Sequence, residues 1–310
     1  MKPLLGALSP LSRLLFFVLL TISSFMFVFL VALLIAMPLF GIGLSDLLTI
    51  SADHTNPRAL PLLRYLQSVQ SVGLFILPSL AAGYLFTGDG ISFAGLHKRG
   101  RVGSYLITLF LIVAMTPFIN WTIGLNESMK LPSFLASIEE WMTDMEQQAI
   151  GLTNMFMSVE TVGGLMINLL VIAVLPAIGE ELLFRGVGQR LLNDWLKNIH
   201  VAIFLSALAF GILHLQFYGL LPRTLLGIIL GYMYYWSGSL WVPVFAHFMN
   251  NAGAVIITWL QGKEVLKPDA GTIGSEGDFW VVGGSLFVTV FILIQFYRYN
   301  KYRHDADWHK

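Results

Sequence analysis

Long apolar runs alternate with short polar segments along most of the chain. Each run approaches the roughly 20 residues that a helix needs to cross the hydrocarbon core of a bilayer. The pattern therefore predicts a polytopic bundle of about eight transmembrane helices. The first run is longer than the apolar part of a signal peptide and is expected to be retained. The predicted spans are 13–40, 67–87, 104–124, 163–187, 199–216, 219–236, 240–260 and 279–298.

The longest stretch that is not strongly apolar, about 125–162, carries a different pattern. Between Ser133 and Glu146, apolar residues recur at helical spacing, and acidic residues lie mostly on the opposite face. This arrangement is typical of an amphipathic helix at a membrane interface. It serves either as a connector packed on the bundle or as a lid over a substrate site. The predicted apolar face contains Phe134, Ile138, Trp141, Met142 and Met145.

Composition supports a membrane protein. Hydrophobic residues make up 56% of the chain, charged residues only 12%, and the mean hydropathy is +0.74. The formal net charge of zero gives no basis for binding nucleic acid. No cysteine is present, which excludes disulfides, thiolate metal sites and thiol nucleophiles. The predicted fold class is all-α, with a single membrane domain over residues 1–310 embedded in the lipid bilayer.

Positive residues are distributed unequally between the two sides that these spans define. Short cytoplasmic loops are enriched in lysine and arginine. With the N-terminus inside, twelve of these residues fall on the cytoplasmic side and six outside. Both termini are therefore predicted to be cytoplasmic, and Arg223 is interpreted as an interfacial anchor. The six outer residues are Arg58, Arg64, Lys130, Arg223, Lys263 and Lys267.

Two adjacent carboxylates, Glu180 and Glu181, lie inside the apolar run 163–187. A charge near the bilayer centre costs from about 2.5 to more than ~10 kcal/mol, so such groups usually face a protein interior or a water-filled cavity. Arg185 follows Glu181 by one helical turn and is expected to pair with it. Glu180, about 100° around the helix, is then free for another role.

Polar residues also occur on two further predicted helices. His214 lies four residues after Phe210 on the fifth span. His247 and Asn251 lie four residues apart on the seventh span and project together, with Asn250 turned away. A carboxylate and imidazoles that converge from separate helices can bind a divalent metal or activate a water as general base. Both are features of hydrolytic enzymes.

The depths of these groups agree only roughly. At about 1.5 Å per residue, Glu180 lies about 18 Å from the cytoplasmic end of its helix, His214 about 22 Å along its own, and His247 about 10 Å. Helix tilt, or helix ends that differ from the predicted ones, must therefore bring the three side chains together.

The order of the motifs resembles a known family. Glu-Glu-x-x-x-Arg, Phe-x-x-x-His and His-x-x-x-Asn on successive membrane helices resemble the CPBP family of CAAX proteases and bacteriocin-processing enzymes, also called the ABI family. The resemblance covers about 170–255, and the catalytic core helices are expected over 165–255. It implies a multi-helix intramembrane endopeptidase. The eukaryotic branch of the family removes the last three residues of prenylated proteins.

The resemblance also implies roles for the motif residues. Glu180 and His214 are expected to activate the attacking water, and Glu181 and Arg185 to hold the site. The third motif is expected to stabilise the oxyanion. The candidate site residues are Glu180, Glu181, Arg185, His214, His247 and Asn251.

A metal mechanism and a metal-free glutamate mechanism both fit the resemblance. In the first, Glu180, His214 and His247 are the three ligands of a divalent ion such as zinc, with a fourth position open. Glu181 is then the spare base. In the second, Glu180 is itself the base.

We therefore expect an endopeptidase that cleaves in a water-accessible cavity opening toward the cytoplasm. Its partner is a peptide or protein substrate at the membrane, such as a prenylated tail, a peptide precursor or a membrane protein terminus. Two other classes also fit the sequence. One is a proton-coupled secondary transporter, with Glu180, His214 and His247 as the coupling site. The other is a membrane adaptor or immunity protein that binds without catalysis.

Overall fold

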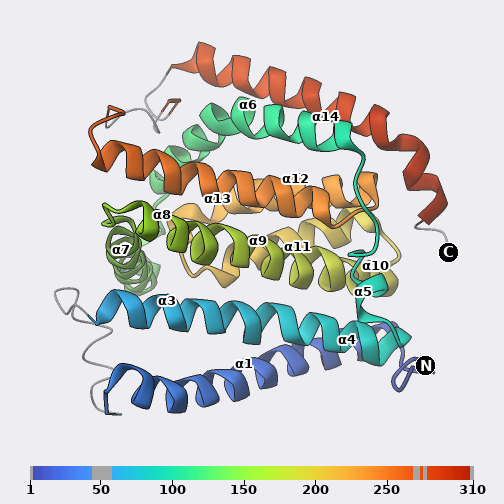
Figure 1. Cartoon of the computed structure of the whole chain (residues 1–310). Helices are drawn as coiled ribbons and strands as arrows, with labels where there is room; N and C mark the ends of the chain where they lie inside the picture. Colours follow the sequence, from blue (N-terminus) through green and yellow to red (C-terminus); the bar gives the residue numbers. More distant parts are fainter. Residues whose placement is uncertain (1–2, 44–57, 268–272, 275–277, 308–310) are drawn as a thin grey trace.

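The computed structural model is a bundle of long helices (Figure 1). It describes residues 3–43, 58–267, 273–274 and 278–307, and these residues form helices and no strand. The all-α fold class is thereby confirmed. The longer helices are α1 (Pro10–Phe40), α3 (Ala59–Gln70), α4 (Leu77–Thr87), α6 (Val102–Glu127), α7 (Ala136–Met157), α11 (Ile199–Leu213), α12 (Leu220–Ser237), α13 (Trp241–Gly262) and α14 (Phe279–Asp307).

Each of the eight predicted spans corresponds to a helical segment, with ends that differ by up to nine residues, as at 187 against Leu196. Among the described residues, five segments are long and apolar enough to cross a membrane, and α11 is a shorter apolar helix. The helical membrane bundle is confirmed, and the count of eight crossings stays a prediction. The five segments are Pro10–Phe40, Ala59–Thr87, Val102–Glu127, Val162–Leu196 and Phe279–Lys301.

The predicted amphipathic stretch is helical and longer than expected. A short 3-10 turn, η2 (Ser133–Leu135), leads into α7, which continues to Met157. No residue of α7 is buried. Figure 1 shows α7 at the end of the bundle opposite the two chain termini. The helix is confirmed, whereas its position at a membrane interface stays a prediction.

The helix that carries the two glutamates is continuous but irregular. A π-helical turn directly precedes Leu175 and Pro176, and a second one follows Glu181. The proline ring clashes with the preceding turn of a regular helix, and a wider π turn relieves this clash. A similar π turn, η1 (Ser71–Ile76), precedes Pro78 in α4. The successive segments are α8 (Val162–Asn168), η3 (Leu169–Val174), α9 (Leu175–Glu181), η4 (Leu182–Gly188) and α10 (Gln189–Leu196).

The glutamate helix lies in the middle of the bundle. In Figure 1, α1, α3 and α4 lie on one side of it, and α6 and α14 on the other, beyond α12 and α13. Its segment α9 packs against η1 and α13. Apolar side chains including Phe75, Phe86, Leu183 and Phe210 form a core cluster around it. These layers separate the charged residues of the helix from lipid.

Candidate active site

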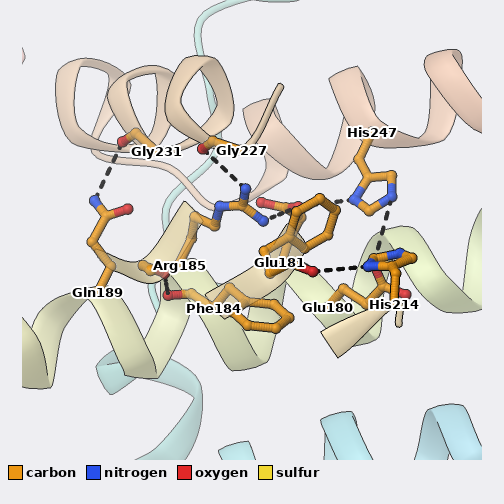
Figure 2. A network of polar contacts seen from close by, with 11 residues as sticks. Glu180, Glu181, Phe184, Arg185, Gln189, His214, Gly227, Gly231 and His247 are labelled. Carbon is orange, nitrogen blue, oxygen red and sulfur yellow. Dashed lines mark hydrogen bonds and ion pairs between the residues drawn. The ribbon is translucent and has the colours of Figure 1, made fainter. Parts of the chain in front are cut away.

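Three helices bring the predicted residues to one cavity. Glu180 lies on α9, His247 on α13, and His214 directly after α11. Glu180 Oε2 is 3.8 Å from His247 Nε2. All three side chains line a cavity of about 450 Å³, and Figure 2 shows them gathered at one end of a polar network. The depths along the helices that were estimated from the sequence agreed only roughly for these three side chains. In the structure, the packing of the helices brings them together.

Glu181 is the centre of this network (Figure 2). Its Oε1 accepts hydrogen bonds from Arg185 Nη1 at 2.7 Å and from His247 Nδ1 at 2.9 Å. The Glu181 and Arg185 side chains are both fully buried. The predicted pair is therefore confirmed, and the contact with His247 is an addition. This buried carboxylate holds its two neighbours in place and is not among the residues that line the cavity.

Arg185 is enclosed on every side. Its Nη2 donates to the carbonyl oxygen of Gly227 at 3.0 Å. The guanidinium carbon also lies 4.9 Å from the ring centroid of Phe210, within the range of a cation–π contact. A carboxylate, a carbonyl and an aromatic face thus compensate for the water that this cation loses on burial.

Two glycines on α12 allow this close packing, and the sequence interpretation did not include them. A Cβ at Gly227 would lie 2.9 Å from the Cβ of Ala207 on α11, and one at Gly231 would lie 2.8 Å from Ile203 Cγ2. Buried Gln189 donates from Nε2 to the Gly231 carbonyl at 3.3 Å. The spacing Gly-x-x-x-Gly, a common motif for close helix packing in membranes, was the available signal.

The hydrogen bonds give both histidines the same tautomer. His214 Nδ1 lies 2.8 Å from the Phe210 carbonyl oxygen, which can only accept, so Nδ1 carries the proton. His247 Nδ1 likewise donates to Glu181. In the neutral rings, each Nε2 therefore carries a lone pair. The Phe210 ring packs against both, with centroid separations of 4.9 Å to His214 and 5.8 Å to His247.

The two asparagines of the third motif lie side by side on the cavity wall. Asn251 Nδ2 donates to the Ile172 carbonyl at 3.1 Å, and Asn250 Nδ2 donates to Asn251 Oδ1 at 3.2 Å. The expectation that Asn250 is turned away is wrong, because both side chains line the cavity. Consecutive residues of an α-helix point about 100° apart, so the cavity wall includes a wide part of the α13 surface.

The cavity is also lined by residues that were not predicted to belong to the site. Arg223 of α12 and Gln216, which follows α11, both line it. The interpretation of Arg223 as an interfacial anchor is corrected accordingly. Helix α7 borders the same cavity, which fits a lid as well as a packed connector. Its lining residues are Ala149, Leu152, Thr153, Phe156 and Met157.

The predicted zinc ligands do not form a metal-binding group. Among the described residues, no three histidine, aspartate or glutamate side chains come together in an arrangement that could hold a metal ion. Glu180, His214 and His247 therefore do not fit a three-ligand zinc site in this conformation. A role for zinc stays a prediction, and no chemical step below depends on it.

The cavity lies toward the α7 end of the bundle. Its wall includes α7, the residues after α11, and Gln67 and Gln70 of α3. Figure 1 shows α7 opposite both termini. If the termini are cytoplasmic, the cavity therefore lies nearer the opposite side of the bundle. The cytoplasmic opening and the cytoplasmic termini both stay predictions.

Comparison with known proteins points to a peptidase family for the same helices. Residues 162–253 match the family model described as type II CAAX prenyl endopeptidase Rce1-like. The Bacillus subtilis (strain 168) protein named "Uncharacterized protein YpbD" is 33% identical over 89 residues, which cover 27% of this chain and 42% of that protein. "Putative membrane peptidase YdiL" of the same organism is also 33% identical over 89 residues, covering 29% of this chain and 36% of that protein.

These matches confirm the resemblance to the CAAX protease family over the helices that carry the three motifs. The chain spans less than half the length of the curated relatives it matches. No solved structure matches the chain. The class defined by fold and site is a helical integral membrane protein with a CAAX-peptidase-like core.

Proposed function

We propose that the protein is an intramembrane endopeptidase that hydrolyses a peptide bond of a hydrophobic, lipidated or membrane-associated substrate. The observation that carries this proposal is the cavity in which Glu180, His214 and His247 meet beside the buried pair of Glu181 and Arg185. The match of the same helices to a CAAX prenyl endopeptidase family supports it.

In the proposed reaction, Glu180 is the general base. Glu180 lines the cavity, and its Oε2 accepts no hydrogen bond from the described residues, so the carboxylate is available to accept a proton from a water there. The water oxygen attacks the carbonyl carbon as Glu180 takes the proton. Glu180 then returns the proton to the leaving amine when the C–N bond breaks. The Nε2 lone pair of His214 can accept the second hydrogen of the same water and orient it.

His247 is proposed to stabilise the oxyanion. Because its Nδ1 donates to Glu181, it can donate to a substrate only when Nε2 also carries a proton. Glu180 Oε2 lies 3.8 Å from Nε2, and Glu181 Oε1 lies 2.9 Å from Nδ1. One such donor typically contributes about 2.7–4 kcal/mol to transition-state stabilisation. Asn251 is proposed as a further donor through the second hydrogen of its amide.

The direct test is cleavage of hydrophobic and prenylated peptides by the purified protein in detergent. We expect Glu180→Gln, His214→Ala and His247→Ala each to lower kcat/KM by about a hundredfold or more, since each removes a group used in the reaction. Lys130→Gln, at an exposed loop position, is the control and should retain activity.

Each other outcome identifies another class. Full cleavage by Glu180→Gln would reject the assigned base. Peptide binding without cleavage that persists in all three variants would favour an adaptor. Proton-coupled uptake of a solute that the three substitutions abolish would favour a transporter. Parallel assays with a chelator test the metal: activity lost with chelator and restored by zinc would support a metalloprotease, and unaffected activity would support the glutamate mechanism.

A further inference from the structure

Arg223 presents a cation to the active-site cavity without a carboxylate of its own. Its Nη1 donates to the Gln216 carbonyl oxygen at 3.1 Å, and its Nη2 donates to Gln216 Oε1. Throughout the part of the chain that the structure describes, no aspartate or glutamate oxygen lies within 4 Å of its guanidinium. Both of these hydrogen bonds of the guanidinium therefore go to neutral oxygens.

Glu146 on α7 interacts electrostatically with Arg223 and is also linked to it through Gln216. Gln216 Nε2 donates to Glu146 Oε1 on α7 at 3.3 Å. The other oxygen of Glu146 is buried and has no hydrogen-bond partner. Arg223 also interacts electrostatically with Glu180 across the cavity. Glu146 thus keeps one oxygen without a hydrogen-bond partner, and no carboxylate lies in direct contact with Arg223.

The contrast with Arg185 shows what a structural arginine looks like in this protein. Arg185 has a carboxylate at 2.7 Å, a backbone carbonyl and an aromatic face, and it is fully buried. Arg223 is partly exposed and faces the cavity. A guanidinium in such a low-dielectric site attracts an anion strongly, and its planar fork matches a carboxylate.

We propose that Arg223 forms a carboxylate-binding subsite in the cavity that contains Glu180 and His214, and that it holds a carboxylate of the peptide substrate. This inference rests on the proposed function. The chemistry fits two sources, the C-terminal carboxylate of the peptide or an acidic side chain near the cleaved bond. In either case Arg223 sets the position of the substrate and takes no part in proton transfer.

Gly219 offers a way to move this cation without removing its charge. A Cβ at Gly219 would overlap the end of the Arg223 side chain, which lies directly over it. Because the overlapping group is the end of a flexible side chain, Gly219→Ala should displace the guanidinium and leave the backbone largely unchanged. It is therefore a second variant, independent of Arg223→Gln.

The test compares matched peptides that differ only in the C-terminal group, free acid or carboxamide. Binding is measured with the full-length Glu180→Gln variant in detergent, so that no peptide is consumed. We expect the acid to bind about tenfold more tightly than the amide, as an interaction with a partly buried charge predicts. Arg223→Gln and Gly219→Ala should remove this ratio, and Arg223→Lys should retain part of it. Lys130→Gln, matched for charge loss, should leave it unchanged.

The ratio separates recognition from structural damage. Arg223 also fixes the segment after His214, so a misplaced segment would weaken both peptides equally and leave the ratio intact. A ratio that survives Arg223→Gln would overturn the inference. A second pair of peptides identifies the source of the carboxylate. Both are amidated at the C-terminus, and they differ only by Asp or Asn at one position. If the protein discriminates within this pair and not between acid and amide, the bound carboxylate is that of an acidic side chain. The absence of discrimination in both pairs would also overturn the inference.

Failure of the subsite and failure of the peptidase give different results. Acid-selective binding without cleavage by the wild-type chain would retain the subsite and reject the peptidase. Cleavage that is lost with Glu180→Gln but is equal within both the acid and amide pair and the Asp and Asn pair would retain the peptidase and reject the subsite.

Discussion

At the scale of single residues, the carboxylate of Glu181 is shared by a cation and by the proposed oxyanion donor. Glu181→Gln keeps the shape of the side chain but removes the charge that compensates for fully buried Arg185. An unpaired buried charge costs about 3–5 kcal/mol, so we expect a clear loss of thermal stability together with loss of cleavage. Thermal unfolding in detergent and the peptide assay measure the two effects.

The double variant Glu181→Gln with Arg185→Met separates stability from activity. It removes both charges, so thermal stability should recover at least in part, whereas His247 still lacks its carboxylate and activity should stay low. Recovery of activity with stability would show that Glu181 acts only as a partner of Arg185.

At the scale of helices, the close approach of α12 to α11 depends on the two glycines under the site. Gly231→Ala would place a methyl group 2.8 Å from Ile203 Cγ2 and 2.9 Å from Gln189 Oε1, both on buried residues. Overpacking of this kind typically costs about 1–3 kcal/mol. The matched control is Gly253→Ala on α13, where no atom lies within 4 Å of the new Cβ. We expect a lower unfolding temperature only for Gly231→Ala.

The short helix α5 (Gly90–Phe93) gives a prediction about pH. Asp89 caps it by accepting hydrogen bonds from Ser92 N at 3.0 Å and Ser92 Oγ at 2.6 Å. These bonds lower the pKa of Asp89 in the folded protein. Its contribution to stability is therefore complete above the unfolded pKa of about 3.9 and is lost as pH falls through the lower folded value.

Asp89→Asn tests this effect, because asparagine caps a helix without titrating. The stability difference between wild type and Asp89→Asn should be constant at neutral pH and should fall below about pH 4. A difference that stays constant down to acid pH would show that the ionised carboxylate contributes nothing to the cap.

At the scale of the whole molecule, the cavity and the chain termini lie at opposite ends of the bundle. The absence of cysteine makes this arrangement directly testable. His97→Cys marks the loop before α6, and Lys130→Cys marks the loop after it; both positions are exposed. If the termini are cytoplasmic, a membrane-impermeant maleimide added to intact cells should label Lys130→Cys alone.

The labelling result also fixes the side from which substrate reaches the cavity. Labelling of Lys130→Cys alone would place the α7 end, and hence the cavity, toward the outside. Labelling of His97→Cys alone would reverse the topology predicted from lysine and arginine and place the cavity toward the cytoplasm. Equal labelling of both would contradict a membrane crossing by α6.

The amino-acid sequence by itself determined the helices, the motif residues and one contact. Apolar runs report local burial in lipid, so the predicted spans all correspond to helical segments. The pairing of Glu181 with Arg185 also follows from a spacing of four residues on one helix and is present in the structure. The π-helical turns on either side of Pro176 change neither the predicted span nor the predicted ion pair.

Contacts between helices were decided only by the tertiary structure. Relative depth, tilt and rotation depend on the packing of side chains from distant segments, such as Gly227 against Ala207. For this reason the bond from His247 to Glu181, the inward position of Asn250 and the cavity-facing Arg223 could not be inferred from spacing along one helix. The same packing places the cavity toward the end of the bundle opposite the termini. This position cannot be inferred from the number of charged residues in the loops.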